Sequence, residues 1–260
     1  MFGWLRRRAR AREIPDTLWN ATLAAYPFLR EYDATRLRQL TGEFLAQKEF
    51  HGAHGLVVTD AMAVAVAAQA VLPVLQLGLG WYDDFVGIVL QPDEVVARRT
   101  SVDDTGVVHD WEEVLAGEAM ERGPVMLSWH DVALAGDAAH EGYNVVIHEF
   151  VHKIDMRDGA PDGCPPMPSK QARAAWLAVM QAEYERFREA VIKAERFGAA
   201  PTWLDPYGAE AIDEFFAVAS EAFFTQRARF AREFPPLLPL FESFFGLQPA
   251  PGLRGQLQKP

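Results

Sequence analysis

The segment VVIHEFVHKID, residues 145–155, is the most informative part of the sequence for the fold. It predicts a helix from about residue 144 to 156, and most of that helix is strongly apolar. Three polar side chains, His148, Glu149 and His152, interrupt the apolar surface. Burying histidine and glutamate without partners is energetically unfavourable, so the pattern indicates that these side chains bind something inside the protein.

Their spacing is that of a metal site. Residues four apart on a helix are offset by about 40° and rise by about 6 Å, so His148 and His152 face the same way. Their ring nitrogens can converge on one ion at about 2.0 Å. Glu149 is rotated by about 100° from His148, which leaves it free to act on a water molecule as general base. The alternative is an ordinary helix that carries the three residues by chance.

A catalytic zinc ion needs a third protein ligand, and two positions compete for it. Asp158 stands where metzincins have a histidine, but Asp155 replaces the glycine that their turn requires. The better candidate is Glu214, in an otherwise apolar helix 62 residues after His152. That separation allows a second helix to cross beside the first. The alternative for Glu214 is an exposed position in the first turns of its helix.

Three further residues have predicted roles around the metal. Tyr207 can donate a hydrogen bond to a developing oxyanion, although a tyrosine in a Pro-Tyr-Gly turn also suits a surface. Glu221, seven residues after Glu214, is expected to accept a hydrogen bond from a ligand or to form a structural ion pair. Asp155 either takes the second N–H of a ligand imidazole or caps a neighbouring element, and both alternatives stay open.

Composition excludes several classes of function. The formal net charge of the 260 residues is −11, which argues against direct nucleic-acid binding because phosphate neutralisation needs a basic surface. The single cysteine, Cys164, cannot form a disulfide within one chain, so a reducing compartment such as the cytoplasm is expected.

One segment, residues 61–82, is uncharged and about long enough to span a bilayer. It contains Gln69, however, and is interrupted by Pro73 and two glycines. We therefore expect a buried helix that starts after an Asp60 cap and ends near Pro73, and no membrane span.

The whole pattern predicts an α+β fold that is mainly helical, with a small sheet. A helical N-terminal part is expected over residues 1–84, a domain that carries the predicted metal site over 85–248 and a disordered tail over 249–260. The expected elements are helices within 16–48 and over 61–72, 144–156, 169–196 and 211–226, and strands over 85–90 and 124–129 with a short strand or hairpin between them.

Several segments together resemble one family, the Mlc titration factor A family of bacterial zinc metallopeptidases. They are GPVMLSWHDV (123–132), GYNVVIHEFVHKIDMRDG (142–159), DGCPPMP (162–168) and DEFFAVASEAFF (213–224). With TDAMAVAVAAQAVLPVLQLGLGWY (59–82), the resemblance covers nearly the whole chain. The catalytic domain of this family is similar to the peptidase domain of anthrax lethal factor, which has a similar HEF-x-H-x-x-D segment.

The resemblance implies a zincin-like metallopeptidase domain that holds one Zn²⁺ ion per chain. It matches His148 and His152 with the histidine ligands, Glu214 with the glutamate ligand, Glu149 with the general base and Tyr207 with the active-site tyrosine.

The resemblance also implies an aminopeptidase-like activity on small peptides in the cytoplasm. It further implies binding and inactivation of the sugar-responsive transcriptional repressor Mlc, although no residue of this chain can be assigned to that interface. The alternative is a regulatory protein-binding factor whose zinc site is latent or modulatory.

Overall fold

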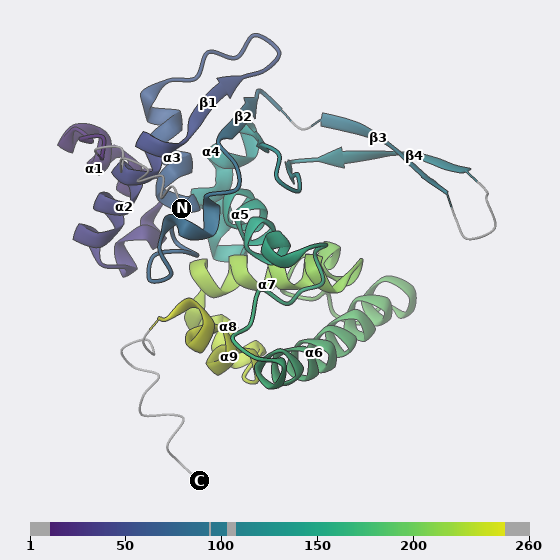
Figure 1. Cartoon of the computed structure of the whole chain (residues 1–260). Helices are drawn as coiled ribbons and strands as arrows, with labels where there is room; N and C mark the ends of the chain where they lie inside the picture. The colour runs from purple at the N-terminus through teal and green to yellow at the C-terminus, as the bar shows by residue number, and fades with distance from the viewer. Residues whose placement is uncertain (1–10, 94, 103–107, 248–260) are drawn as a thin grey trace, which may run out of the picture.

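The structure is a computed structural model that describes residues 11–93, 95–102 and 108–247 (Figure 1). Its α-helices are α1 (Asp16–Ala25), α2 (Ala34–Gln47), α3 (Asp60–Ala70), α4 (Trp129–Ala138), α5 (Val145–Asp155), α6 (Lys170–Phe197), α7 (Ile212–Thr225), α8 (Arg227–Glu233) and α9 (Leu237–Phe245). Its strands are β1 (Glu49–Gly52), β2 (Gly87–Gln91), β3 (Val95–Val102), β4 (Val108–Leu115), β5 (Gly117–Ala119) and β6 (Val125–Ser128). The predicted α+β class, with helices predominating, is confirmed. The tail expected over 249–260 lies outside the described residues.

The main sheet has the strand order β1-β2-β6-β5. β1, β2 and β6 are parallel, and β5 is antiparallel to β6 at the edge opposite β1. β2 and β6 confirm the predicted strands, with ends that differ by one or two residues. β1 and β5 were not predicted, since they are only four and three residues long and show no alternation of apolar side chains. β1 joins the expected N-terminal part to this sheet, and the division at residue 84 stays a prediction.

The connection between β2 and β6 contains the expected hairpin. β3 and β4 pair antiparallel, from Val95 opposite Leu115 to Val102 opposite Val108. Figure 1 shows this hairpin extending away from the helices. Only Ala116 separates the end of β4 from the start of β5.

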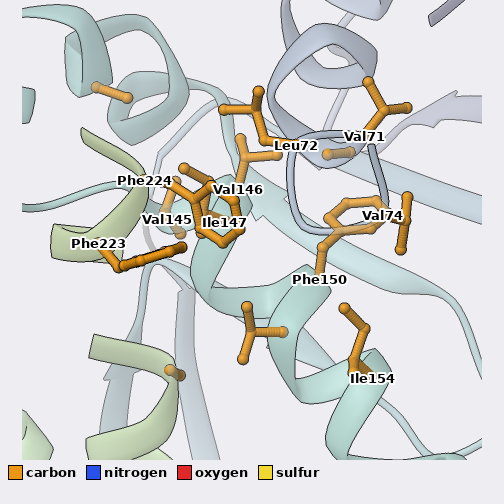
Figure 2. Packing of buried hydrophobic residues seen from close by; sticks show 14 of the residues in the cluster. Val71, Leu72, Val74, Val145, Val146, Ile147, Phe150, Ile154, Phe223 and Phe224 are labelled. Carbon is orange, nitrogen blue, oxygen red and sulfur yellow. The ribbon is translucent and has the colours of Figure 1, made fainter. Parts of the chain in front are cut away.

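The helix that carries the His-Glu motif, α5, lies in the middle of the hydrophobic core. Its apolar side chains pack with residues that follow α3 and with phenylalanines of α7 (Figure 2). Fully burying such a side chain contributes about 1.5–3 kcal/mol, so this packing holds α5 firmly in place. The labelled members of the cluster are Val71, Leu72, Val74, Val145, Val146, Ile147, Phe150, Ile154, Phe223 and Phe224.

Side chains cap the N-termini of five described α-helices, α2 to α6. Ser169 caps α6 by accepting a hydrogen bond from the N–H of Ala172 at 3.1 Å, and Gly198 ends that helix with a φ of 70°. The expectation for α3 was wrong by one residue, because Thr59 is its N-cap and Asp60 is its first helical residue. The hydroxyl of Thr59 accepts a hydrogen bond from the N–H of Met62 at 3.3 Å, so the capping side chain is that of Thr59 and not that of Asp60.

The uncharged segment 61–82 does not form one long helix. α3 ends at Ala70 and the chain turns before Pro73, and a short 3-10 helix follows at Leu79–Tyr82. Within the described ranges, no helix is long and apolar enough to cross a membrane.

Candidate metal centre

α5 and α7 pack against each other and bring the three sequence-predicted ligands together. His148 Nε2 lies 3.1 Å from both His152 Nε2 and Glu214 Oε2, and His152 Nε2 lies 3.3 Å from Glu214 Oε2. The three side chains are 11–18% exposed, so the cluster is largely shielded from solvent. Glu214 does lie in the first turn of α7, as its alternative assumed, but its carboxylate points to the histidines.

The triangle of donor atoms fits a small divalent metal ion. Ligand atoms about 2.0 Å from a tetrahedral ion lie about 3.3 Å from one another. The three distances between His148, His152 and Glu214 are 3.1, 3.1 and 3.3 Å. Two imidazole nitrogens and one carboxylate oxygen are also the donor set of many catalytic metal sites, in which further coordination positions stay open.

The electrostatics of the cluster agree with this fit. Burial raises the pKa of Glu214, but the hydrogen bonds from His148 and His152 outweigh it and hold that pKa well below its usual range. Burial lowers the pKa of His148, but Glu214 and Glu221 raise it well above its ordinary value. The carboxylate is therefore ionised at neutral pH. A proton and a metal cation compete for the ring nitrogen of His148, so metal binding there must release a proton.

Glu221 lies behind His148 and orients it. The His148 Nδ1 atom is 2.8 Å from Glu221 Oε1, and the backbone N–H of Asn144 donates to Glu221 Oε2. The Glu221 side chain is 2% exposed. Of the two roles considered for Glu221, the geometry is that of a hydrogen-bond acceptor behind His148, a predicted ligand. A carboxylate in this position fixes the ring orientation and raises the basicity of the ligand nitrogen.

Glu221→Gln is expected to weaken metal affinity by about 10- to 100-fold. The amide has the same shape, but its NH₂ group would meet either the N–H of Asn144 or the N–H of His148. Competition with a chelator of known affinity measures the effect. Glu183→Gln is the matched control, because Glu183 is also buried but pairs with Arg186 on α6. Equal affinities in both variants would contradict the role of Glu221.

The hydrogen bonds behind Glu221 extend to the N-terminal helices. The Asn144 side chain accepts from the N–H of Ile147 at 2.9 Å as the N-cap of α5, and its amide nitrogen donates to Gln69 Oε1 at 2.7 Å. The sequence singles out Gln69 as a polar residue in an apolar helix, and Asn144 could have been found as an N-cap. Neither pattern indicates that the two side chains meet.

Glu149 is separate from the ligand cluster, as its place on the helix predicts. It is 5% exposed and packs against β5, where a Cβ on Gly117 would lie only 2.6 Å from Glu149 Oε1. Burial raises the pKa of Glu149, while His148 and His152 lower it. A buried carboxylate with a raised pKa is suited to accept and return a proton. The contact with Gly117 was not predicted, since it depends on how β5 lies against α5.

The cluster opens into a cavity of about 490 Å³. Tyr207 lies in its wall, in a short 3-10 helix at Pro206–Ala209, and is 39% exposed. The centre of its ring is 6.1 Å from that of His148. Tyr207 therefore faces both the cavity and solvent, and its role toward an oxyanion stays a prediction. The lining is Ala116, Gly117, Glu118, Ala119, Tyr143, Val145, His148, Glu149, His152, Met156, Pro161, Asp205, Tyr207, Asp213, Glu214, Val218 and Glu221.

The two aspartates after the motif do not join the ligand group. Asp158 lies in a 3-10 turn at Met156–Asp158, so the geometry favours Glu214 as the third ligand. Asp155 Oδ2 accepts the backbone N–H groups of Asp162 and Gly163 at 3.1 and 2.8 Å. Of its two open alternatives, the hydrogen bonds are those of a cap. Burial raises the pKa of Asp155 to about 6.

The loop that Asp155 caps supports α7. Gly163 has a φ of 71°, and a Cβ there would lie 2.7 Å from the carbonyl oxygen of Ile212. A residue with a side chain would be strained in this conformation and would push against the backbone two residues before Glu214. The loop therefore packs closely against the first turn of α7, and glycine at position 163 permits this close approach.

Comparison with known proteins identifies one matching family and several related proteins. The glucose-regulated metallo-peptidase M90 family matches residues 1–246. Mlc titration factor A of Edwardsiella ictaluri is 36% identical over 222 residues, which cover 85% of this chain and 83% of that protein. Mlc titration factor A of Escherichia fergusonii is 34% identical over 252 residues, covering 94% and 92%. An uncharacterized protein of Synechocystis sp. is 31% identical over 251 residues, covering 95% and 89%.

Proposed function

The chain belongs to the glucose-regulated metallo-peptidase M90 family, and from that premise we propose that it is a zinc-dependent peptidase of the aminopeptidase type. The proposal rests on one observation, the convergence of His148, His152 and Glu214 beside the buried carboxylate of Glu149 in one cavity. Two imidazoles and a carboxylate are a common ligand set of catalytic zinc. We include in the proposal a zincin-like domain over residues 85–248 and a cytoplasmic location.

Each residue of the site has a part in the proposed hydrolysis. His148, His152 and Glu214 would hold the zinc ion, which would polarise the peptide carbonyl as a Lewis acid and lower the pKa of water at the site. Glu149 accepts the proton of the attacking water and passes it to the leaving amine. Tyr207 donates a hydrogen bond from its hydroxyl group to the oxyanion that forms on the carbonyl oxygen. Glu221 holds His148 in the ligating orientation throughout.

Hydrolysis of a panel of chromogenic peptides tests the proposal. Zinc-loaded protein is compared with Glu149→Gln on substrates that have either a free or a blocked amino terminus. An aminopeptidase is supported if the wild-type protein, but not the variant, hydrolyses substrates with a free amino terminus. Preference for substrates with a blocked amino terminus would make it an endopeptidase. If neither protein hydrolyses any substrate while zinc is bound, the peptidase proposal fails.

Tyr207→Phe is expected to lower kcat by about 100-fold, the order of effect seen when one oxyanion donor is removed. KM and metal affinity should stay within about twofold, because the phenol contributes to the transition state rather than to ground-state binding. Steady-state kinetics measure the split. Tyr184→Phe is the control, since the Tyr184 hydroxyl donates to the carbonyl oxygen of Ala209 at 3.1 Å. An unchanged kcat in Tyr207→Phe would remove Tyr207 from the mechanism.

A second function is favoured by the names of the relatives. Two of the three relatives described above are called Mlc titration factor A, and we propose that this chain also binds and inactivates a repressor of the Mlc type. Size-exclusion chromatography of the repressor with the Glu149→Gln variant tests this. A complex would show that binding is independent of catalysis. A repressor that elutes alone at micromolar concentrations of both proteins would contradict the proposal.

A further inference from the structure

Lys153, the residue after the second histidine of the motif, has its ammonium group inside the protein. Its side chain is 0% exposed. The Nζ atom donates to the carbonyl oxygens of Met120 at 2.7 Å and Gly123 at 3.3 Å, and lies 3.6 Å from Asp84 Oδ2. It also lies 4.7 Å from the centre of the Phe85 ring.

A buried charge of this kind is weak as a device for stability. Desolvation of an ammonium group offsets most of what its partners contribute, and apolar residues of similar volume often serve as well. A buried lysine instead contributes to local geometry, because its N–H groups fix the positions of the carbonyl oxygens that accept their hydrogen bonds. Met120 and Gly123 are therefore held at set positions relative to α5.

These two residues form the turn that joins β5 to β6. The N–H of Gly123 donates to the carbonyl oxygen of Met120 at 3.0 Å, and Arg122 between them has a φ of 52°. β5 is only three residues long and pairs with β6 on one side. A short edge strand with one partner is weakly specified in its register, so a contact from outside the sheet has a large influence on where it lies.

Lys153 and Glu149 reach the same hairpin from the same helix. They are four residues apart on α5, so their side chains lie on one face. Glu149 packs against Gly117 at the start of β5, and Lys153 binds Met120 directly after its end. The predicted ligands lie on the face of α5 that meets α7.

We propose that Lys153 is a positioning residue that fixes strand β5 against Glu149. Two contacts from α5, one at each end of the strand, keep the cavity wall at residues 116–119 at a constant distance from the carboxylate. The wall and the general base then act on one bound substrate chain. The catalytic part of this inference rests on the proposed peptidase function, whereas the placement of β5 does not.

Lys153→Met is compared with Lys48→Met to test the inference. Lys48 is a second buried lysine, whose Nζ donates to the carbonyl oxygen of Phe85 at 2.6 Å and lies 3.7 Å from the Phe85 ring centre. It lies outside the cavity lining. Both variants remove a buried charge near Phe85, and only one of them releases the turn after β5.

At a temperature where both variants are folded, Lys153→Met is expected to raise KM at least threefold and lower kcat/KM at least tenfold. Its zinc affinity should stay within twofold, because Lys153 donates to the turn after β5 and not to His148, His152 or Glu214. Lys48→Met should lower the melting temperature and keep KM and kcat/KM. A purely structural role of Lys153 would reduce the fraction of active protein, so that kcat would fall at an unchanged KM, and this result would overturn the inference.

Amide hydrogen exchange measures how firmly β5 is held, and it does not depend on catalytic activity. Exchange over residues 116–123 should become faster in Lys153→Met and stay unchanged over α7. Unchanged exchange at 116–123 would overturn the inference even if activity fell. If the unchanged chain hydrolyses no peptide, the proposed function fails, and faster exchange would still support the placement of β5.

Gly123→Ala serves if Lys153→Met does not fold. A Cβ at Gly123 would lie 2.7 Å from Met120 Cβ, so this variant displaces the turn and leaves the buried charge in place. It is expected to raise KM and to speed exchange at 116–123 in the same way. A Gly123→Ala protein with normal KM and normal exchange would contradict the role of this turn.

Discussion

Glu149→Gln will abolish peptide hydrolysis and leave the metal site intact. General acid–base catalysis contributes about 10²–10⁴-fold, and an amide cannot accept the proton of water, so we expect kcat to fall at least about 10³-fold. Glutamine keeps the shape of the side chain and its packing against Gly117. Glu149 is outside the group formed by His148, His152 and Glu214, so metal content should not change.

Steady-state kinetics with the peptide panel measure the fall in kcat. Metal analysis of the same samples measures the metal content. Glu210→Gln is the control, because Glu210 follows the short helix of Tyr207 but does not line the cavity. Activity within about tenfold of the unchanged chain would contradict the assignment, since removing a general base costs at least about 10²-fold. The proton acceptor would then have to be another cavity carboxylate, such as Asp213.

The sequence predicts those elements whose signals are local. α5 begins one residue after its Asn144 cap and ends one residue before the expected limit, because its apolar run and its cap agree. α6 starts after Ser169 and stops at Gly198 for the same kind of reason. The spacing of His148 and His152 is likewise a property of one helix, so their convergence follows from the sequence alone.

What the sequence leaves open depends on contacts between distant segments. β5 has three residues, too few for a pattern, and its value to the site comes from the contacts that Glu149 and Lys153 make with its two ends. The choice between Asp158 and Glu214 depends on where α7 crosses α5. The close approach of Gly163 to the backbone of Ile212, at the start of α7, is another contact between distant segments that no local pattern encodes.

Glu214→Ala will remove the metal rather than only the activity. Two imidazoles remain in this variant, and the negative charge that offsets the ion is gone. Loss of a partner behind a ligand typically costs about 10- to 100-fold in affinity, and we expect loss of the ligand itself to cost at least about 100-fold. Chelator competition measures the affinity. Asp158→Ala is the control, because Asp158 lies outside the cavity lining.

Thermal unfolding gives a second measure of the same loss. A ligand that binds only the folded state stabilises it by RT ln(1 + [L]/Kd), so a 100-fold weaker site loses about 2.7 kcal/mol of metal-dependent stabilisation when zinc is in large excess. The unchanged chain and Asp158→Ala should therefore gain the same increase in melting temperature on addition of zinc, and Glu214→Ala should gain much less. Should Glu214→Ala instead keep full zinc occupancy and the full increase, the third ligand would have to be Asp158 or Asp155. In that case the close approach of Glu214 Oε2 to His148 and His152 would have to be a hydrogen-bonded contact without a bound ion.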